Sequence, residues 1–172
     1  MSGVTPLAVI PVGVLVERST SAGRWSDFLW RPTGVLTGVP ETPAWTKLSV
    51  DGGHTTFYAG AADVKLHRAE AANYRDNLMS GTPLLWVLLR PTDADPPYEL
   101  AVVTADPAEG EAMAAIGDGI VESVAMPDSI QDAVAAFVSQ HHVERAFVKR
   151  ERDRADPNAL ARRVPLRDDE TE

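Results

Sequence analysis

The sequence predicts an α+β fold, with an N-terminal antiparallel β-meander followed by alternating helices and strands that pack on this sheet or extend it. Apolar, strand-like stretches joined by turn-forming residues fill the first 66 residues, and amphipathic segments alternate with short apolar strands afterwards. The 172 residues suffice for one hydrophobic core. We expect one domain over residues 1–154. A mobile charged tail is expected over residues 155–172, where apolar periodicity stops.

Four strands are predicted in the first part of the chain. They cover residues 8–16, 28–36, 45–50 and 55–59, which are rich in Val, Ile, Leu, Trp and Thr. Pro32 indicates a bulge or an edge strand, because proline has no backbone N–H to donate. Asp51-Gly52-Gly53 is a tight-turn signal that joins the last two strands. Val64 and Leu66 alternate with charged residues, which favours an extension of this pairing.

Three helices are predicted after residue 67, with strands at 84–89, 98–103 and 120–125 between them. The first helix covers residues 68–80, and Gly81 suits its C-terminal cap. The second begins at Asp106, which is followed by Pro107 and Glu109, and it ends near Gly117. The third is predicted to be capped by Asp128. Its apolar face consists of Ile130, Val134, Phe137 and Val138.

Composition and charge exclude several classes of function. The formal net charge of −9 lies within residues 1–148, because basic and acidic residues balance after that point. Such a body repels a phosphate backbone, so no nucleic-acid partner is expected. No apolar run approaches the roughly 20 residues of a membrane span, and no signal peptide is recognised, so a cytoplasmic protein without a membrane partner is expected. The absence of cysteine excludes disulfides and thiolate sites.

The segment 141–154, HHVERAFVKRERDR, contains the densest run of basic residues and follows the last helix. It is the predicted surface for a protein partner, together with the aromatic residue of a Gly-Arg-Trp-Ser loop, because aromatic residues beside arginine favour interfaces. The alternative is a solvated helix or tail with charge pairs along one face. The candidate partner-binding residues are Trp25, His142, Glu144, Phe147, Lys149, Arg150 and Arg152.

Two adjacent histidines and a glutamate, His141, His142 and Glu144, are also metal-ligand types. Adjacent histidines point apart, however, and no third ligand has helical spacing with them. His141 continues the apolar stripe of Phe137 and Val138, and it suits the last turn of a helix. We therefore expect no metal site and no cofactor.

A second polar concentration lies at the start of the first predicted helix, and it is the candidate site for a small-molecule ligand. His67 could serve as a general base there. A solvated helix surface explains the same residues, so both interpretations stay open. The candidate ligand-binding residues are His67, Arg68, Asn73, Arg75 and Asn77. Motifs such as G-x-S-x-G, H-E-x-x-H and the phosphate-binding GK[ST] loop are absent from the sequence.

Three segments resemble the bacterial family known as domain of unknown function 3305. They are IPVGVLVER at 10–18 with WRPTGVL at 30–36, LHRAEAANYRDNL at 66–78, and HHVERAFVKRERD at 141–153. The resemblance implies genes beside those of molybdenum-dependent formate dehydrogenase, and hence a role in assembling, maturing or regulating that enzyme. The implied partner is a subunit of the enzyme or a maturation factor. The resemblance supplies no catalytic residues.

Three kinds of function therefore remain open. The first is an accessory protein that acts through protein contacts. The second is a cofactor- or nucleotide-handling enzyme with a polar pocket around His67, Arg68 and Arg75. The third is a purely structural domain. Some relatives are labelled molybdopterin-guanine dinucleotide synthesis proteins, but the glycine- and lysine-containing loop of such enzymes is replaced here by the predicted strand 8–16.

Overall fold

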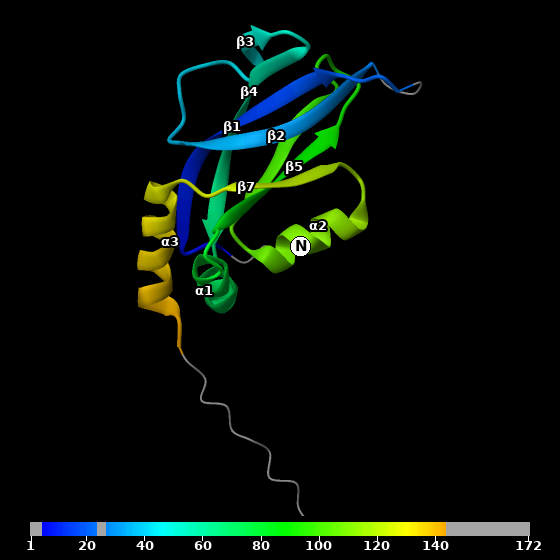
Figure 1. Cartoon of the computed structure of the whole chain (residues 1–172). Coiled ribbons are helices and arrows are strands. Elements are labelled where there is room, and N and C mark those ends of the chain that lie inside the picture. The colour runs from blue at the N-terminus through cyan, green and yellow to red at the C-terminus, as the bar shows by residue number, and fades with distance from the viewer. Residues whose placement is uncertain (1–4, 24–26, 144–172) are drawn as a thin grey trace, which may run out of the picture. The chain divides into compact units, whose positions relative to one another are not determined.

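The structure, a computed structural model, describes residues 5–23 and 27–143. These residues form seven strands and three α-helices (Figure 1), and the predicted α+β class is confirmed. The elements are β1 (Ala8–Thr20), β2 (Phe28–Thr37), β3 (Thr46–Asp51), β4 (His54–Leu66), a 3-10 turn (Arg68–Glu70), α1 (Ala71–Met79), β5 (Leu84–Pro91), β6 (Tyr98–Thr104), α2 (Pro107–Ile116), β7 (Ile120–Ala125) and α3 (Asp128–His141). The predicted boundary between residues 154 and 155 lies outside the described residues.

The first four strands form an antiparallel sheet in the order β2-β1-β4-β3. The predicted meander is therefore wrong, because β1 pairs with both β2 and β4 while β3 pairs with β4 alone. The β1–β4 ladder is long and runs from Ala8 opposite Leu66 to Ser19 opposite His54. This order places the most apolar strand, β1, in the centre of the sheet. β3, in which five of six residues are exposed, lies at an edge.

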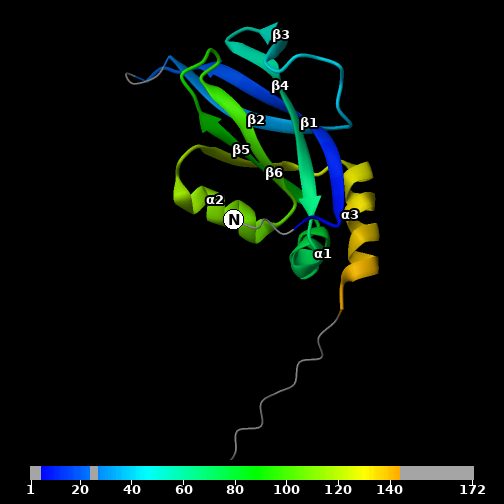
Figure 2. The same cartoon turned by 180° about the vertical axis from the view of Figure 1, so that it is seen from behind.

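The last three strands form a separate antiparallel sheet in the order β6-β5-β7. It packs on the first sheet rather than extending it, as Figures 1 and 2 show from opposite sides. The core between the sheets is made by valines of β1, Val64 and Leu66 of β4, and the alternating residues Leu85, Val87 and Leu89 of β5, all of which are buried. Burial of this apolar surface is the main stabilising contribution.

The helices cover the second sheet and one end of the two sheets (Figure 2). α1 packs on α3, where the rings of Tyr74 and Phe137 lie 6.0 Å apart in a T-shaped arrangement. α2 packs on β5 so closely that a Cβ at Gly110 would overlap the ring of Trp86. The predicted position of His141 on the apolar stripe is confirmed, because its ring lies 4.5 Å from that of Phe137.

The predicted ends of α2 agree with the structure, whereas the predicted start of α3 does not. The Asp106 carboxylate accepts a hydrogen bond from the N–H of Ala108 at 2.9 Å, and Gly117 adopts φ 71°, so both ends of α2 are confirmed. The predicted cap of α3 is wrong, because Pro127 occupies the N-cap position and no side chain caps this helix.

None of the helices in the described part of the chain is long and apolar enough to cross a membrane.

Candidate functional site

A hollow of about 310 Å³ lies between β4 and β6. It is bordered by Ala61 to Lys65 of β4 except Val64, by His67, by the five consecutive residues Leu100 to Thr104 of β6, and by Glu109 of α2. Side chains alternate between the two faces of a strand. Because consecutive residues of both strands border the hollow, its walls are the edges of the strands rather than one face of either sheet.

Among the residues that the structure describes, neither of these strand edges has a pairing partner along the hollow. β3 pairs with β4 only as far as Tyr58, so from Ala59 to Leu66 the described ladders join β4 to β1 alone. In the same set of ladders, β6 pairs with β5 alone. Each edge therefore presents backbone N–H and C=O groups outside any ladder, and such groups are able to pair with an additional extended segment.

The hollow combines small apolar side chains with charged groups at its border. Ala61, Ala62 and Ala101 provide room, and Asp63, Lys65 and Glu109 provide the charge.

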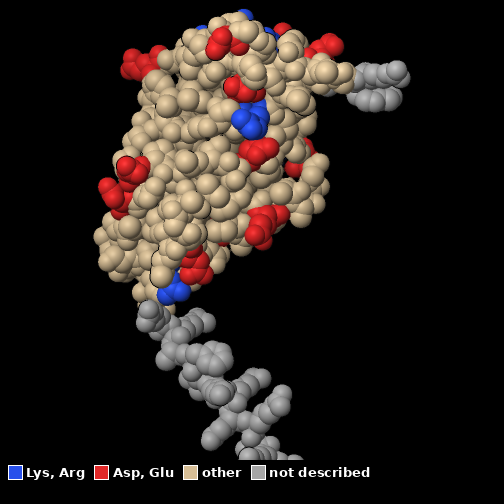
Figure 3. Space-filling model, viewed as in Figure 1, with Lys and Arg blue, Asp and Glu red and all other residues tan. Residues whose placement is uncertain are grey.

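Acidic side chains are spread over the face of the molecule that Figure 3 shows, and few basic side chains lie among them. A nucleic-acid interface typically has a continuous basic stripe instead, and the face in Figure 3 has none.

His67 lies at the border of the hollow, directly after β4. Its backbone N–H donates a hydrogen bond to the hydroxyl oxygen of Tyr74 at 3.0 Å. Its Nδ1 atom is buried and has no hydrogen-bond partner among the described residues. A buried imidazole nitrogen without a partner is costly, so His67 Nδ1 is a polar group that the described residues leave unsatisfied.

Tyr74 anchors α1 beneath His67 and is only 1% exposed. Burial raises the pKa of its phenol above the ordinary value of 10.0, and the negative charges of Asp106, Glu70 and Glu109 raise this pKa further. The hydrogen bond from the His67 backbone lowers the pKa and opposes these effects. Tyr74 is therefore held in its neutral form at physiological pH.

The two asparagines of α1 hydrogen-bond to the protein framework. Asn73 Nδ2 donates to Glu70 Oε2 at 3.1 Å and to Asp106 Oδ1 at 3.0 Å. The amide of Asn77, which is 5% exposed, bonds with the main chain of Leu84 and Ala105. These bonds tie α1 to the ends of β5 and β6, and neither asparagine borders the hollow.

The structure brings only His67 of the five candidate ligand-binding residues to the hollow. Arg68 is exposed, and Arg75 donates hydrogen bonds to the neighbouring Asp76. Sequence reasoning missed Lys65, Thr104 and Glu109, because no local pattern shows that β4 and β6 lie side by side.

Of the candidate partner-binding residues, the structure places only His142. It is half-buried, and its N–H donates to the oxygen of Val138 at 2.8 Å, which ends α3. Trp25, Glu144, Phe147, Lys149, Arg150 and Arg152 lie outside the described residues. Within residues 5–23 and 27–143, no three histidine or carboxylate side chains gather as metal ligands.

The sequence of this chain matches one known protein family over most of its length. The family model described as "Protein of unknown function (DUF3305)" matches residues 11–151. The chain belongs to this family. The match begins within β1 and ends after α3, so every residue that borders the hollow lies within the DUF3305 region. No curated protein and no solved structure matches the chain.

Proposed function

We propose that this DUF3305 member is an accessory protein that binds an extended segment of a protein partner between β4 and β6. The supporting observation is the hollow whose two walls are unpaired strand edges. A segment that enters it gains main-chain hydrogen bonds, which is a recurring mode of peptide recognition. A hollow of about 310 Å³ accepts a few residues of a chain rather than a folded element.

We further propose that the partner is a subunit or maturation factor of molybdenum-dependent formate dehydrogenase in the cytoplasm. Support for this identity comes from the sequence resemblance alone, because the matched family model carries no function. The residues proposed from sequence as partner-binding, Trp25 and the set from His142 to Arg152, are candidates for a second contact. Two separate contacts on one partner increase affinity through effective concentration.

Co-purification from the native host tests this proposal. The full chain carries an affinity tag, and formate dehydrogenase subunits and maturation factors are measured by mass spectrometry. Ala61→Trp and Ala101→Trp fill the hollow and are expected to reduce partner recovery about tenfold or more. Ala115→Trp on the exposed side of α2 is the matched control and should leave recovery unchanged.

Two outcomes would contradict separate parts of the proposal. If both hollow-filling variants fold and recover the partner as well as the original chain, the binding site is wrong. If the original chain recovers no formate dehydrogenase protein, and cells without its gene keep full formate dehydrogenase activity, the partner is wrong. A thermal unfolding curve for each variant separates loss of binding from loss of folding.

A second candidate function is a cofactor- or nucleotide-handling enzyme. The observation that favours it is that His67 borders the hollow and that its buried Nδ1 atom has no hydrogen-bond partner among the described residues. Arg68 and Arg75 do not border the hollow, which weakens the version that uses all three residues. This function predicts a small molecule that remains bound in native mass spectrometry and is lost in His67→Ala. Mass spectra that show only the bare chain would count against it.

A further inference from the structure

A second site lies at the other end of β1, where Arg18 occupies the centre of a row across the first sheet. Arg18 is directly opposite Trp30 of β2 and Thr55 of β4, and Thr55 is directly opposite Val50 of β3. Residues in direct register point to the same face of a sheet. The row therefore combines a guanidinium with an aromatic ring and with the side chain of Val50, which is 63% exposed.

Aromatic rings surround the guanidinium of Arg18. Its Cζ atom lies 4.3 Å from the ring centroid of Phe28, 5.4 Å from that of Phe57 and 5.6 Å from that of Trp30. Trp30 in turn packs against Trp45 and Tyr98, with centroids 5.9 and 6.0 Å apart. Stacking on rings fixes the plane of a guanidinium and leaves its terminal Nη–H groups, which lie in that plane, available for an anion.

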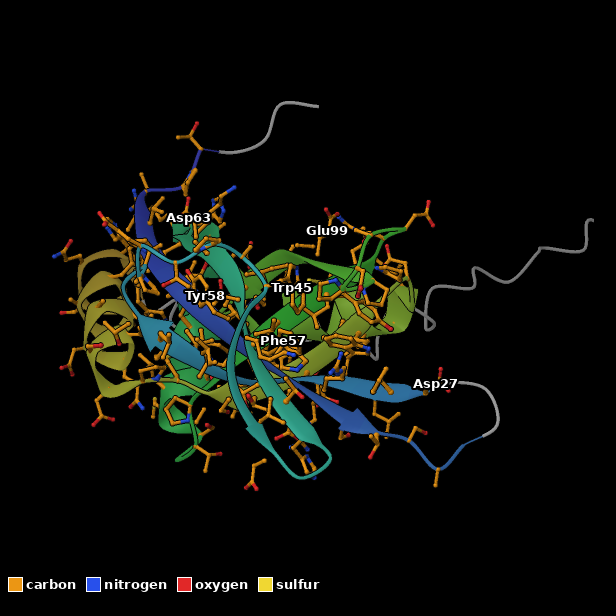
Figure 4. The ribbon with its side chains drawn as sticks, turned by 90° about the horizontal axis from the view of Figure 1, so that it is seen from above. Asp27, Trp45, Phe57, Tyr58, Asp63 and Glu99 are labelled. Carbon is orange, nitrogen blue, oxygen red and sulfur yellow. The ribbon has the colours of Figure 1, made fainter. Side chains whose placement is uncertain are left out.

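The charge of Arg18 has no counter-ion among the described residues. Its Nε atom is buried without a hydrogen-bond partner. The ion pairs within the described part of the chain are Glu17–His54 and Arg75–Asp76, and neither includes Arg18. Figure 4 looks onto this end of the molecule and shows Trp45 and Phe57 near its centre, with Asp27 and Glu99 toward the margins. Partial burial of an unpaired charge costs stability, and an incoming anion offsets that cost.

We propose that Arg18 anchors a binding site for one carboxylate of a partner polypeptide, flanked by apolar side chains. The planar guanidinium fork matches a carboxylate in shape and charge. Phe28 and Val50, which are 37% and 63% exposed, provide apolar surface beside it. The formal net charge of −9 repels a polyanion at long range. The site therefore favours a ligand with a single carboxylate and apolar neighbouring side chains. This site is separate from the hollow and does not depend on the proposed function.

Three synthetic tripeptides distinguish the possible sources of the carboxylate. Acetyl-Leu-Glu-Leu-amide has a side-chain carboxylate, acetyl-Leu-Gln-Leu with a free C-terminus has a terminal one, and acetyl-Leu-Gln-Leu-amide has none. Each is titrated into the full ¹⁵N-labelled chain while the Nε–H signal of Arg18 and the indole signals are recorded by NMR. At least one carboxylate peptide should shift these signals saturably and bind about tenfold more tightly than the neutral peptide.

Arg18→Lys keeps the positive charge but removes the planar fork, and it is expected to weaken binding of that peptide about tenfold. Arg90→Lys, on the exposed end of β5, is the matched control and should bind as the original chain does. Equal binding of all three peptides, no shift with any of them, or unchanged binding by Arg18→Lys would each overturn the proposal. The comparison between peptides uses the unaltered chain, so it holds even if a variant fails to fold.

Discussion

The side-chain amide of Asn77 and the main chain of Leu84 form a closed pair of hydrogen bonds. Asn77 Nδ2 donates to the oxygen of Leu84 at 2.8 Å, and the N–H of Leu84 donates to Asn77 Oδ1 at 3.0 Å. The same Nδ2 atom donates to the oxygen of Ala105 at 2.9 Å. One side chain of α1 thus satisfies backbone groups where β5 begins and directly after β6 ends, which fixes the helix to the second sheet.

Replacement of Asn77 should therefore destabilise the fold strongly. Asn77→Leu has a similar volume but leaves the buried backbone groups of Leu84 and Ala105 without partners, which we expect to lower the free energy of unfolding by about 3 kcal/mol. Urea unfolding followed by circular dichroism measures this change. Met79→Ala, at a position 76% exposed on the same helix, should change it by less than about 0.5 kcal/mol. A similarly small effect for Asn77→Leu would show that these bonds contribute little.

Gly110 should resist replacement by alanine. Within a helix this change ordinarily stabilises a protein by about 1 kcal/mol. Here the new Cβ would overlap the ring of Trp86, so we expect a loss of about 1–3 kcal/mol in urea unfolding. Trp86→Ala removes the overlapping atoms, and Gly110→Ala should then cost much less in the double variant than alone. Additive effects of the two changes would mean that the close approach does not limit stability.

Stability should fall at alkaline pH because of Tyr74. Its pKa is raised in the folded chain, so above about pH 10 the unfolded chain releases the phenol proton first. Folding then opposes ionisation, and the free energy of unfolding decreases as pH rises from 10 toward the folded-state pKa. Tyr74→Phe should flatten this part of the curve, measured by urea unfolding at several pH values, while Tyr98→Phe keeps it because Tyr74 remains. An unchanged slope in Tyr74→Phe would assign the effect to other groups.

A chain that ends after Val143 should fold with unchanged stability. The core of the described residues lies between Val12 and Phe137, so the shortened chain keeps all of it. We expect the thermal midpoint to stay within a few degrees, and partner recovery from the native host to fall because residues 144–154 are missing. If recovery is unchanged, the segment after α3 is not a partner surface. A chain that ends after Arg154 is the matched control and should recover the partner fully.

In the candidate sites, the local sequence pattern predicted correctly which residues share a helix face, but not which of them can contact a ligand. Helical spacing correctly placed His141 on the stripe of Phe137, because both residues belong to one helix. The same reasoning grouped Arg75 and Asn77 as possible ligand contacts, although Asn77 points into the framework and Arg75 bonds to its neighbour. Spacing tells which residues share a face of a helix, but the packing of the whole chain decides which face is inside.

The sequence by itself determined the strands, the helices and most of their ends, because these depend on neighbouring residues: alternating apolar positions, the Asp51-Gly52-Gly53 turn, and the Asp106 cap. The tertiary structure alone decided that β1 pairs with β4. It also decided that His67 borders the same hollow as β6 and that Arg18 lies over Phe28. The alternation of apolar and polar residues determines which side of a strand is apolar. It does not determine which strand lies beside it. That choice is made by the burial gained when distant segments pack together.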